Sequence, residues 1–264
     1  MEQVTPDFYA ANADLYAAIS LPTLPGQLAA LSSVVQVPLE GAVVEIGAGV
    51  GTALPVLATM TSDSLYAVEP SKYMRVGLMT KVAGDETLRK RVTVLSGTFD
   101  QAVHRLPLRL SGIVALNVLG HFEPTELKLF WQFASQRLDP GGQLVVGLQP
   151  PFEPVDIPWT DFGESRIGDL VYRMAGTASI TSDMVARWTV RWTTLDTDGV
   201  ELERREASTK WSVVGPRQVT DAAIAAGLEL SRQSSDGTII SFRQPDGNSP
   251  KTSSLPKSNP RKAE

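Results

Sequence analysis

The sequence of 264 residues contains no cysteine and only two histidines. The lack of cysteine excludes disulfides and any zinc site built on thiolates. No apolar run reaches the roughly 18 residues that a membrane-spanning helix needs, and the first residues lack the basic and apolar regions of a signal peptide. We therefore expect a cytoplasmic protein that does not contact a membrane.

Positive charge is also scarce, because 24 lysines and arginines stand against 29 aspartates and glutamates, for a net charge of −5. No basic stripe of the kind that neutralises phosphates occurs before the C-terminal tail, so we expect no nucleic-acid partner. The sequence shows no Ser-His-Asp triad and no spaced set of metal ligands, and we expect no metal. A small organic molecule is the expected partner.

Between residues 42 and 150, apolar runs alternate with helical patterns. This alternation is typical of buried parallel strands joined by right-handed crossovers. The predicted strands are 42–47, 64–70, 91–97, 112–120 and 143–150, and the predicted helices include 51–60, 71–83 and 123–138. Two short helices, at 6–19 and 27–36, are expected before them, with a break at 21–27 where two prolines occur.

After residue 150 the pattern changes to strict alternation, which is typical of antiparallel strands. In 184–196, Trp188 and Trp192 fall on one face and arginines fall on the other. An Asp-Gly pair then predicts a tight turn into a returning strand at 201–214.

Three glycines, Gly47, Gly49 and Gly51, lie between the first predicted strand and its helix. Glycine permits positive φ angles and a close approach of a ligand to the backbone, and a helix start presents free N–H groups. NAD, FAD and S-adenosylmethionine all suit such a loop. However, Thr52 stands where the dinucleotide fingerprint has its third glycine, and Glu45 would repel a pyrophosphate but attract an ammonium group.

The resulting pattern, Glu-x-Gly-x-Gly-x-Gly over 45–51, resembles motif I of the class I S-adenosylmethionine-dependent methyltransferases. Further segments are similar to that family in the same order: EPSKYM at 69–74, SGTF at 96–99, LNVLGHF at 116–122 and a Pro-Gly-Gly turn before the fifth strand. The resemblance covers 40–150 well and 216–243 loosely. It implies S-adenosylmethionine as the cofactor and methyl transfer to N or O of a small organic acceptor, for example a secondary metabolite.

The resemblance also implies the fold. We expect an α/β, Rossmann-like, seven-stranded and mostly parallel sheet with helices on both faces, an N-terminal helical lid and an antiparallel β insertion after the fifth strand. The expected divisions are the lid at 1–40, the cofactor-binding core at 41–150, the insertion at 151–215, a closing helix and hairpin of the core at 216–244, and a disordered tail at 245–264.

A set of cofactor-binding residues follows from the same resemblance. It assigns Glu45 to the amino-acid end of the cofactor and Glu69 to the ribose hydroxyls. Met74 is expected to pack on the adenine or simply in the core, and Thr98 or Asp100 is expected to contact the adenine amino group. The full set is Tyr16, Glu45, Gly47, Ala48, Gly49, Gly51, Glu69, Pro70, Met74, Thr98, Phe99 and Asn117.

Methyl transfer from a sulfonium needs alignment and exclusion of water more than it needs catalytic side chains. A phenol or alcohol acceptor benefits from a general base, and His121 is the candidate because imidazole titrates near neutral pH. A capping or packing role for His121 is the alternative. His104 is expected to be an exposed helix residue.

The insertion is rich in large apolar side chains, which we expect to line the acceptor pocket together with the N-terminal helix. The same exposed strands could instead form a homodimer interface. The residues concerned are Trp159, Phe162, Tyr172, Met174, Trp188 and Trp192. A protein of this fold could also bind the cofactor as structure and catalyse another reaction such as a cyclisation, or act as a binding module.

Overall fold

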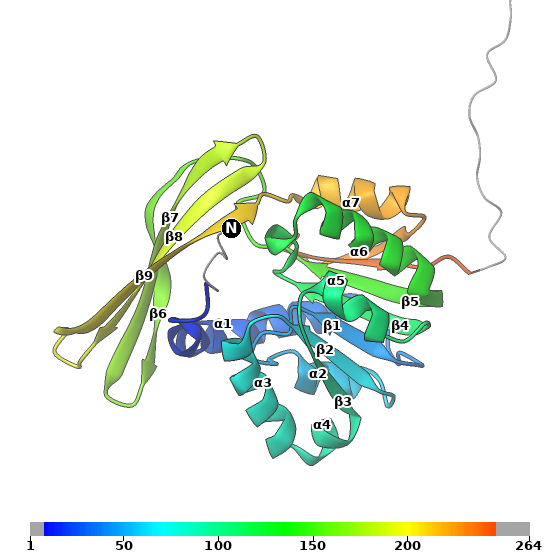
Figure 1. Ribbon diagram of the computed structural model, residues 1–264, viewed down its shortest axis with the longest axis horizontal. Coiled ribbons are helices and arrows are strands. Elements are labelled where there is room, and N and C mark those ends of the chain that lie inside the picture. The colour runs from blue at the N-terminus through cyan, green and yellow to red at the C-terminus, as the bar shows by residue number, and fades with distance from the viewer. Residues whose placement is uncertain (1–7, 247–264) are drawn as a thin grey trace, which may run out of the picture.

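The computed structural model describes residues 8–246, without the side chains of residues 21–24. It consists of a seven-stranded sheet with helices on both faces and a separate four-stranded sheet beside it (Figure 1). The expected α/β fold with an antiparallel insertion is therefore confirmed. Nearly all of the expected disordered tail, 245–264, lies outside the described residues.

The larger sheet supplies the scaffold of the core. Its strands are β1 (Val43–Ile46), β2 (Leu65–Glu69), β3 (Val92–Ser96), β4 (Leu110–Leu116), β5 (Leu138–Gly147), β10 (Glu229–Gln233) and β11 (Ile239–Arg243), in the order β10-β11-β5-β4-β1-β2-β3. The first five strands run parallel, and β11 pairs antiparallel with both β5 and β10. The strand order changes direction between β1 and β4, which opens a crevice at their carboxyl ends.

Helices cover both faces of this sheet because its central strands are apolar on both sides. They are α1 (Ala13–Val34), α2 (Leu54–Met60), α3 (Lys72–Gly84), α4 (Glu86–Arg91), α5 (Phe99–Ala102), α6 (Pro124–Arg137) and α7 (Pro216–Ala225). In β1, Val44 and Ile46 lie in the cluster that α6 and α7 complete, whereas Val43 packs with Leu31 of α1 and Leu57 of α2. The alternation of side chains along β1 thus builds two cores.

The structure has one helix, α1, where the sequence predicted two helices and a break at 21–27. Proline in a helix interior removes a backbone hydrogen bond, which is why the local sequence favours a break. Contacts at both ends of the helix oppose this preference. Leu15 and Ile19 pack against Trp192 of the smaller sheet, and Leu31 lies in the core under the larger sheet. The predicted break is therefore wrong.

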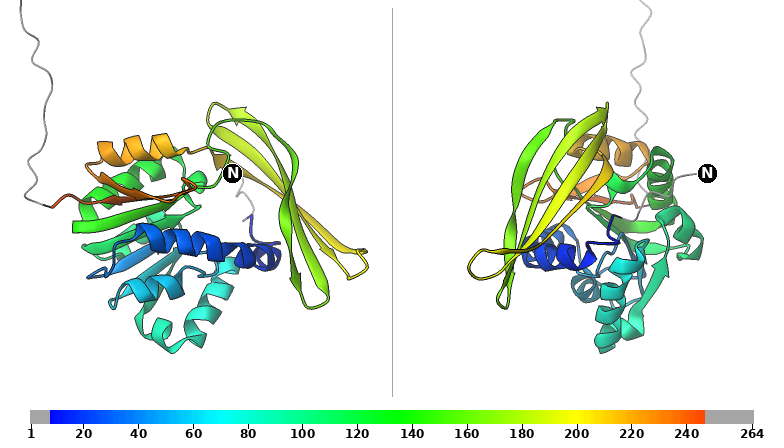
Figure 2. Two further views of the ribbon diagram at one scale, coloured as in Figure 1. Left: turned by 180° about the vertical axis from the view of Figure 1, so that it is seen from behind. Right: turned by 60° about the vertical axis from the view of Figure 1, so that its left-hand side comes forward.

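The insertion forms an antiparallel sheet of four strands, of which the sequence pattern indicated two. They are β6 (Ile157–Ile167), β7 (Leu170–Ser182), β8 (Val185–Leu195) and β9 (Glu201–Ser212), paired in that order. In β8, Trp188 and Trp192 are buried and Arg187 is exposed, as the alternation predicted. Figure 2 shows this sheet beside the larger one, with the start of α1 between them.

Candidate functional site

A cavity of about 760 Å³ lies where β1, β2, β3 and β4 end. Residues of α1 and β9 line its remaining side. A volume of that order accommodates a drug-sized ligand. Open α/β sheets bind their ligands at this edge, where the strand order changes direction. The cavity is therefore the candidate site.

The glycine loop after β1 has positive φ angles of 72° at Gly47, 55° at Gly49 and 77° at Gly51. Gly47, Ala48 and Gly49, which the resemblance assigned to cofactor binding, line the cavity. Gly51 does not line it. A Cβ atom on Gly51 would lie 2.7 Å from Cδ1 of Leu78, so this glycine permits close packing against α3.

Two carboxylates flank the loop and are almost wholly buried, with exposed fractions of 4% for Glu45 and 5% for Glu69. Glu69 accepts hydrogen bonds from the backbone N–H of Gly49 at Oε2 and of Ser71 at Oε1, both at 2.8 Å. Oε2 of Glu45 has no hydrogen-bond partner among residues 8–246. A buried carboxylate oxygen without a donor is unfavourable unless a ligand supplies one.

The protonation state of Glu45 depends on this burial. Burial, and then the negative charge of Glu69, raise the pKa of Glu45 from 4.5 to about 8. At neutral pH the ligand-free site therefore holds a mostly protonated carboxyl group. A cation placed beside Glu45 would favour its ionised form, so the site fits a ligand that carries an ammonium group.

The part of the cavity wall formed by the residues that follow β2 and β3 is less polar. Pro70, Met74 and Thr98 line it, and the Thr98 hydroxyl hydrogen-bonds to Asp100, which does not line the cavity. Of the two candidates for the adenine contact, Thr98 is therefore the one that faces the cavity. The side chain of Phe99 packs among core phenylalanines, so its backbone is what it can offer a ligand.

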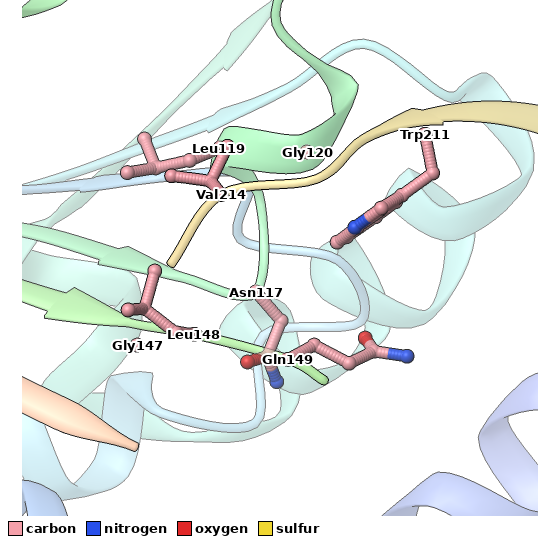
Figure 3. Close-up of a pocket in the computed structure, with 8 residues that line it drawn as sticks. All are labelled: Asn117, Leu119, Gly120, Gly147, Leu148, Gln149, Trp211 and Val214. Atoms are coloured by element: carbon pink, nitrogen blue, oxygen red, sulfur yellow. The ribbon is translucent and has the colours of Figure 1, made fainter. Parts of the chain in front are cut away.

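The chain turns sharply after β4, which ends at Leu116 and not at the predicted residue 120. Asn117 has a φ of 54°, in a region that asparagine tolerates better than most residues. Asn117 lines the large cavity and also a small one of about 10 Å³, which it shares with Gln149 and Trp211 (Figure 3). Its Oδ1 is buried without a partner in the described chain, and the small cavity has room for about one water molecule.

His121 follows in the 3₁₀ turn Leu119–His121, and it is an exposed residue that lines the large cavity. The Tyr9 hydroxyl lies 3.4 Å from its Nε2, and the indole ring of Trp211 contacts it edge-on with ring centres 4.7 Å apart. The bare backbone of Gly120 permits this contact, because a Cβ atom there would lie 2.0 Å from Cε2 of Trp211.

Desolvation by the surrounding protein lowers the pKa of His121 to about 4. The imidazole is therefore neutral at physiological pH, and the same desolvation makes it a weaker base than a free imidazole. His104, in contrast, is exposed, as predicted.

The start of α1 closes the cavity. Tyr16 lines it, its hydroxyl hydrogen-bonds with Ser20, and burial raises the pKa of Tyr16. Tyr9 packs edge-on against Tyr16 with ring centres 5.2 Å apart. Arg205 of β9 holds this segment by donating to the Asp14 carboxylate at 2.9 Å.

The aromatic residues of the insertion do not line the large cavity. Trp192 packs against α1, the ring of Trp188 contacts Phe162, and the guanidinium of Arg191 lies 4.2 Å from the ring centre of Trp159. These side chains stabilise the smaller sheet and its contact with α1. The structure therefore does not support the predicted pocket of insertion aromatics, and β9 supplies the wall in their place.

Several cavity residues were not predicted from the sequence. They belong to α1, α5, α6 and β9, which fold over the strand ends from distant parts of the chain. The inward-facing position in the alternation of β9 is a signal that could have identified Thr209. These residues include Ser20, Gln27, Gln101, Glu126, Ser208 and Thr209.

Within residues 8–246, no three His, Asp or Glu side chains are arranged to hold a metal ion. No helix in this described part is both long and apolar enough to cross a membrane.

No protein-family model matches the chain, and no curated protein matches its sequence. Solved structures do match its fold. DesVI from Streptomyces venezuelae gives a TM-score of 0.71 at 19% identity, over 89% of this chain and 99% of DesVI. The CcbJ methyltransferase from Streptomyces caelestis gives 0.63 at 22% identity, over 90% and 98% of the two chains. CalS10 from Micromonospora echinaspora, described as an amino pentose methyltransferase with S-adenosylmethionine bound, gives 0.62 at 17% identity, over 92% and 99%.

The chain therefore has the fold of the S-adenosylmethionine-dependent methyltransferases over nearly its whole described length. Identities from 17% to 22% show a common fold and leave the reaction to be argued from the site.

Proposed function

We propose that this protein is an S-adenosylmethionine-dependent methyltransferase that acts on a nitrogen or oxygen of a small organic acceptor, such as a secondary metabolite. The observation that carries the proposal is the pair of buried carboxylates at the glycine loop, Glu45 with an unpartnered oxygen and Glu69 on the next strand. A cofactor with an ammonium group and two ribose hydroxyls matches this pair. The pyrophosphate of NAD or FAD would meet negative charge there.

The other lining residues suit the remaining parts of this cofactor. Glu69 could accept the ribose hydroxyls, because it lines the cavity and a carboxylate offers about four lone-pair sites. Pro70 and Met74 offer an apolar surface for the adenine, with Thr98 at its edge. Asn117 would lie beside the methionine chain. When bound, S-adenosylmethionine supplies a methyl group whose carbon an acceptor atom attacks while the sulfur leaves as a neutral thioether.

The acceptor would lie between the glycine loop and the side chains of Tyr9, Tyr16, His121 and Thr209. These walls exclude water and limit the orientations of the acceptor, which is the main contribution that a methyl transfer requires. His121, which lines the cavity, is the residue that would accept the proton that the acceptor loses. The names of two similar proteins, an amino pentose methyltransferase and a sugar N-methyltransferase, support nitrogen as the acceptor atom.

Calorimetric titration with S-adenosylmethionine, S-adenosylhomocysteine and NAD tests the cofactor class. We expect both adenosyl compounds to bind and NAD not to bind. Glu45→Gln and Glu69→Gln should each weaken S-adenosylhomocysteine binding by about tenfold, since each removes a charge-assisted hydrogen bond. Glu40→Gln, at an exposed position, is the matched control. Binding of NAD alone, or equal affinity in all three variants, would reject the proposal.

A further inference from the structure

The charged groups that line the large cavity are all acidic among the described residues. Glu45, Glu69 and Glu126 contribute carboxylates, and no lysine or arginine from residues 8–246 lines the wall. The rest of the acceptor side is aromatic or neutral, with Phe8, Tyr9, Tyr16 and Thr209 as its main members.

Two arginines close in sequence to lining residues, Arg75 beside Met74 and Arg205 on the strand of Thr209, are engaged elsewhere. Arg75 donates to the backbone oxygens of Glu69 and Pro70, both at 2.7 Å. Arg205 donates to the backbone oxygen of Ala11 at 2.6 Å, besides its pairing with Asp14. Neither side chain lines the cavity, so neither is placed to meet a ligand there.

His121 does not supply a positive charge either, because its lowered pKa leaves the ring neutral at physiological pH. A phosphate or carboxylate on the acceptor would therefore be buried without a counter-charge from the protein wall. Burial of an unpaired charge is strongly unfavourable.

An ammonium group meets the opposite situation. Aromatic ring faces attract cations, and Phe8, Tyr9 and Tyr16 present three aromatic rings at the acceptor side. The carboxylates add a negative potential to the cavity. The same rings also favour an apolar body on the molecule that carries the amine.

We infer that the acceptor is an amine that enters as an ammonium ion on an otherwise uncharged, largely apolar scaffold, and that amines bearing a phosphate or carboxylate are rejected. This inference rests on the proposed function and specifies the acceptor class of the same site. Phosphorylated and nucleotide-linked amines are excluded by it.

Three probes with one indole body test the inference: tryptamine, tryptophan and indole-3-propionate. They carry an ammonium group, both charges and a carboxylate respectively. With the protein saturated by S-adenosylhomocysteine, calorimetry should show tryptamine binding at least tenfold more tightly than the other two. Equal or tighter binding of indole-3-propionate would overturn the inference, and so would the absence of tryptamine binding.

A variant that introduces a positive charge tests whether the preference for an ammonium group arises in the cavity. Thr209→Arg places a guanidinium on the acceptor wall and should improve indole-3-propionate binding at least tenfold while weakening tryptamine. Val200→Arg adds the same charge on the exposed loop between β8 and β9 and should leave the preference unchanged. An unchanged preference in Thr209→Arg would overturn the inference.

Binding of S-adenosylhomocysteine is measured first, without a probe. Its absence would reject the proposed function, whereas its presence together with a preference for the carboxylate probe would reject only the acceptor class.

Discussion

The buried position of Glu45 makes the stability of the protein depend on pH. Its pKa is raised from 4.5 to about 8, so between these values the folded protein holds a proton that the unfolded chain has released. The stability of the ligand-free protein should therefore decrease as the pH rises through this window, and Glu45→Gln should flatten the decrease. Chemical unfolding at about pH 5, 6.5 and 8 measures this effect.

Cofactor binding should release the same proton, because a neighbouring ammonium group favours the carboxylate. Calorimetry near pH 7, in buffers of different ionisation enthalpy, should show proton release on S-adenosylhomocysteine binding to the wild type and less release for Glu45→Gln. The same number of protons in both proteins would contradict the assignment of Glu45 to the ammonium group.

His121 provides the third prediction at this scale. Because its pKa is lowered to about 4, turnover should show no histidine titration near neutral pH. For an acceptor that needs a base, His121→Ala should lower kcat by about 100-fold, the lower end of general-base effects, with little change in S-adenosylhomocysteine affinity. His104→Ala, at the exposed second histidine, should change neither quantity. Full turnover of His121→Ala at every pH would remove the general-base role.

Among the elements, α1 depends most on contacts distant in sequence. Trp192 of β8 packs against Leu15 and Ile19, and Arg205 of β9 pairs with Asp14. Because the Asp14 side chain is 64% exposed, its pair with Arg205 should contribute only about 1 kcal/mol or less to global stability. The effect of Arg205 should therefore be local, on the segment that closes the cavity.

Arg205→Gln should loosen residues 8–20 without unfolding the core. We expect faster hydrogen exchange in that segment and about two- to fivefold weaker S-adenosylhomocysteine binding, since a less ordered wall must be ordered on binding. Arg204→Gln is the control, because Arg204 pairs with Glu201 at an exposed position. Identical exchange in the two variants would contradict this role of Arg205.

In the whole molecule, the smaller sheet leaves an open edge at β6, which has one strand partner within residues 8–246. Trp159 and Ile167 on β6 are 47% and 53% exposed. Open edges with exposed apolar side chains favour pairing with another chain, and the homodimer remains a prediction. Light scattering should give twice the chain mass of 28.5 kDa.

Ile167→Asp should convert this dimer to a monomer, because it places a charge in the contact. Leu202→Asp changes a similarly exposed residue on the opposite edge strand, β9, and should leave the dimer intact. A monomeric wild type at all concentrations would show that the β6 edge does not mediate self-association.

Much of the core was predictable because each strand and the turn after it depend on neighbouring residues. Ser71 caps α3 by accepting a hydrogen bond from the backbone N–H of Met74, which is a contact between near neighbours in the sequence. Glu45 and Glu69 reach the cavity because both occupy strand positions next to their loops. Predictions failed where a residue meets a distant partner, as where Leu15 and Ile19 of α1 pack against Trp192.

The sequence by itself determined the order of strands and helices in the core, the glycine loop and the two carboxylates beside it. Only the tertiary structure decided that α1 continues through two prolines, that Gly51 packs on α3 outside the cavity, and that β9 lines the cavity. These features depend on contacts such as that between Arg205 and Ala11, which are 194 residues apart. The combined free energy of such packing outweighs the local preferences that a sequence pattern reports.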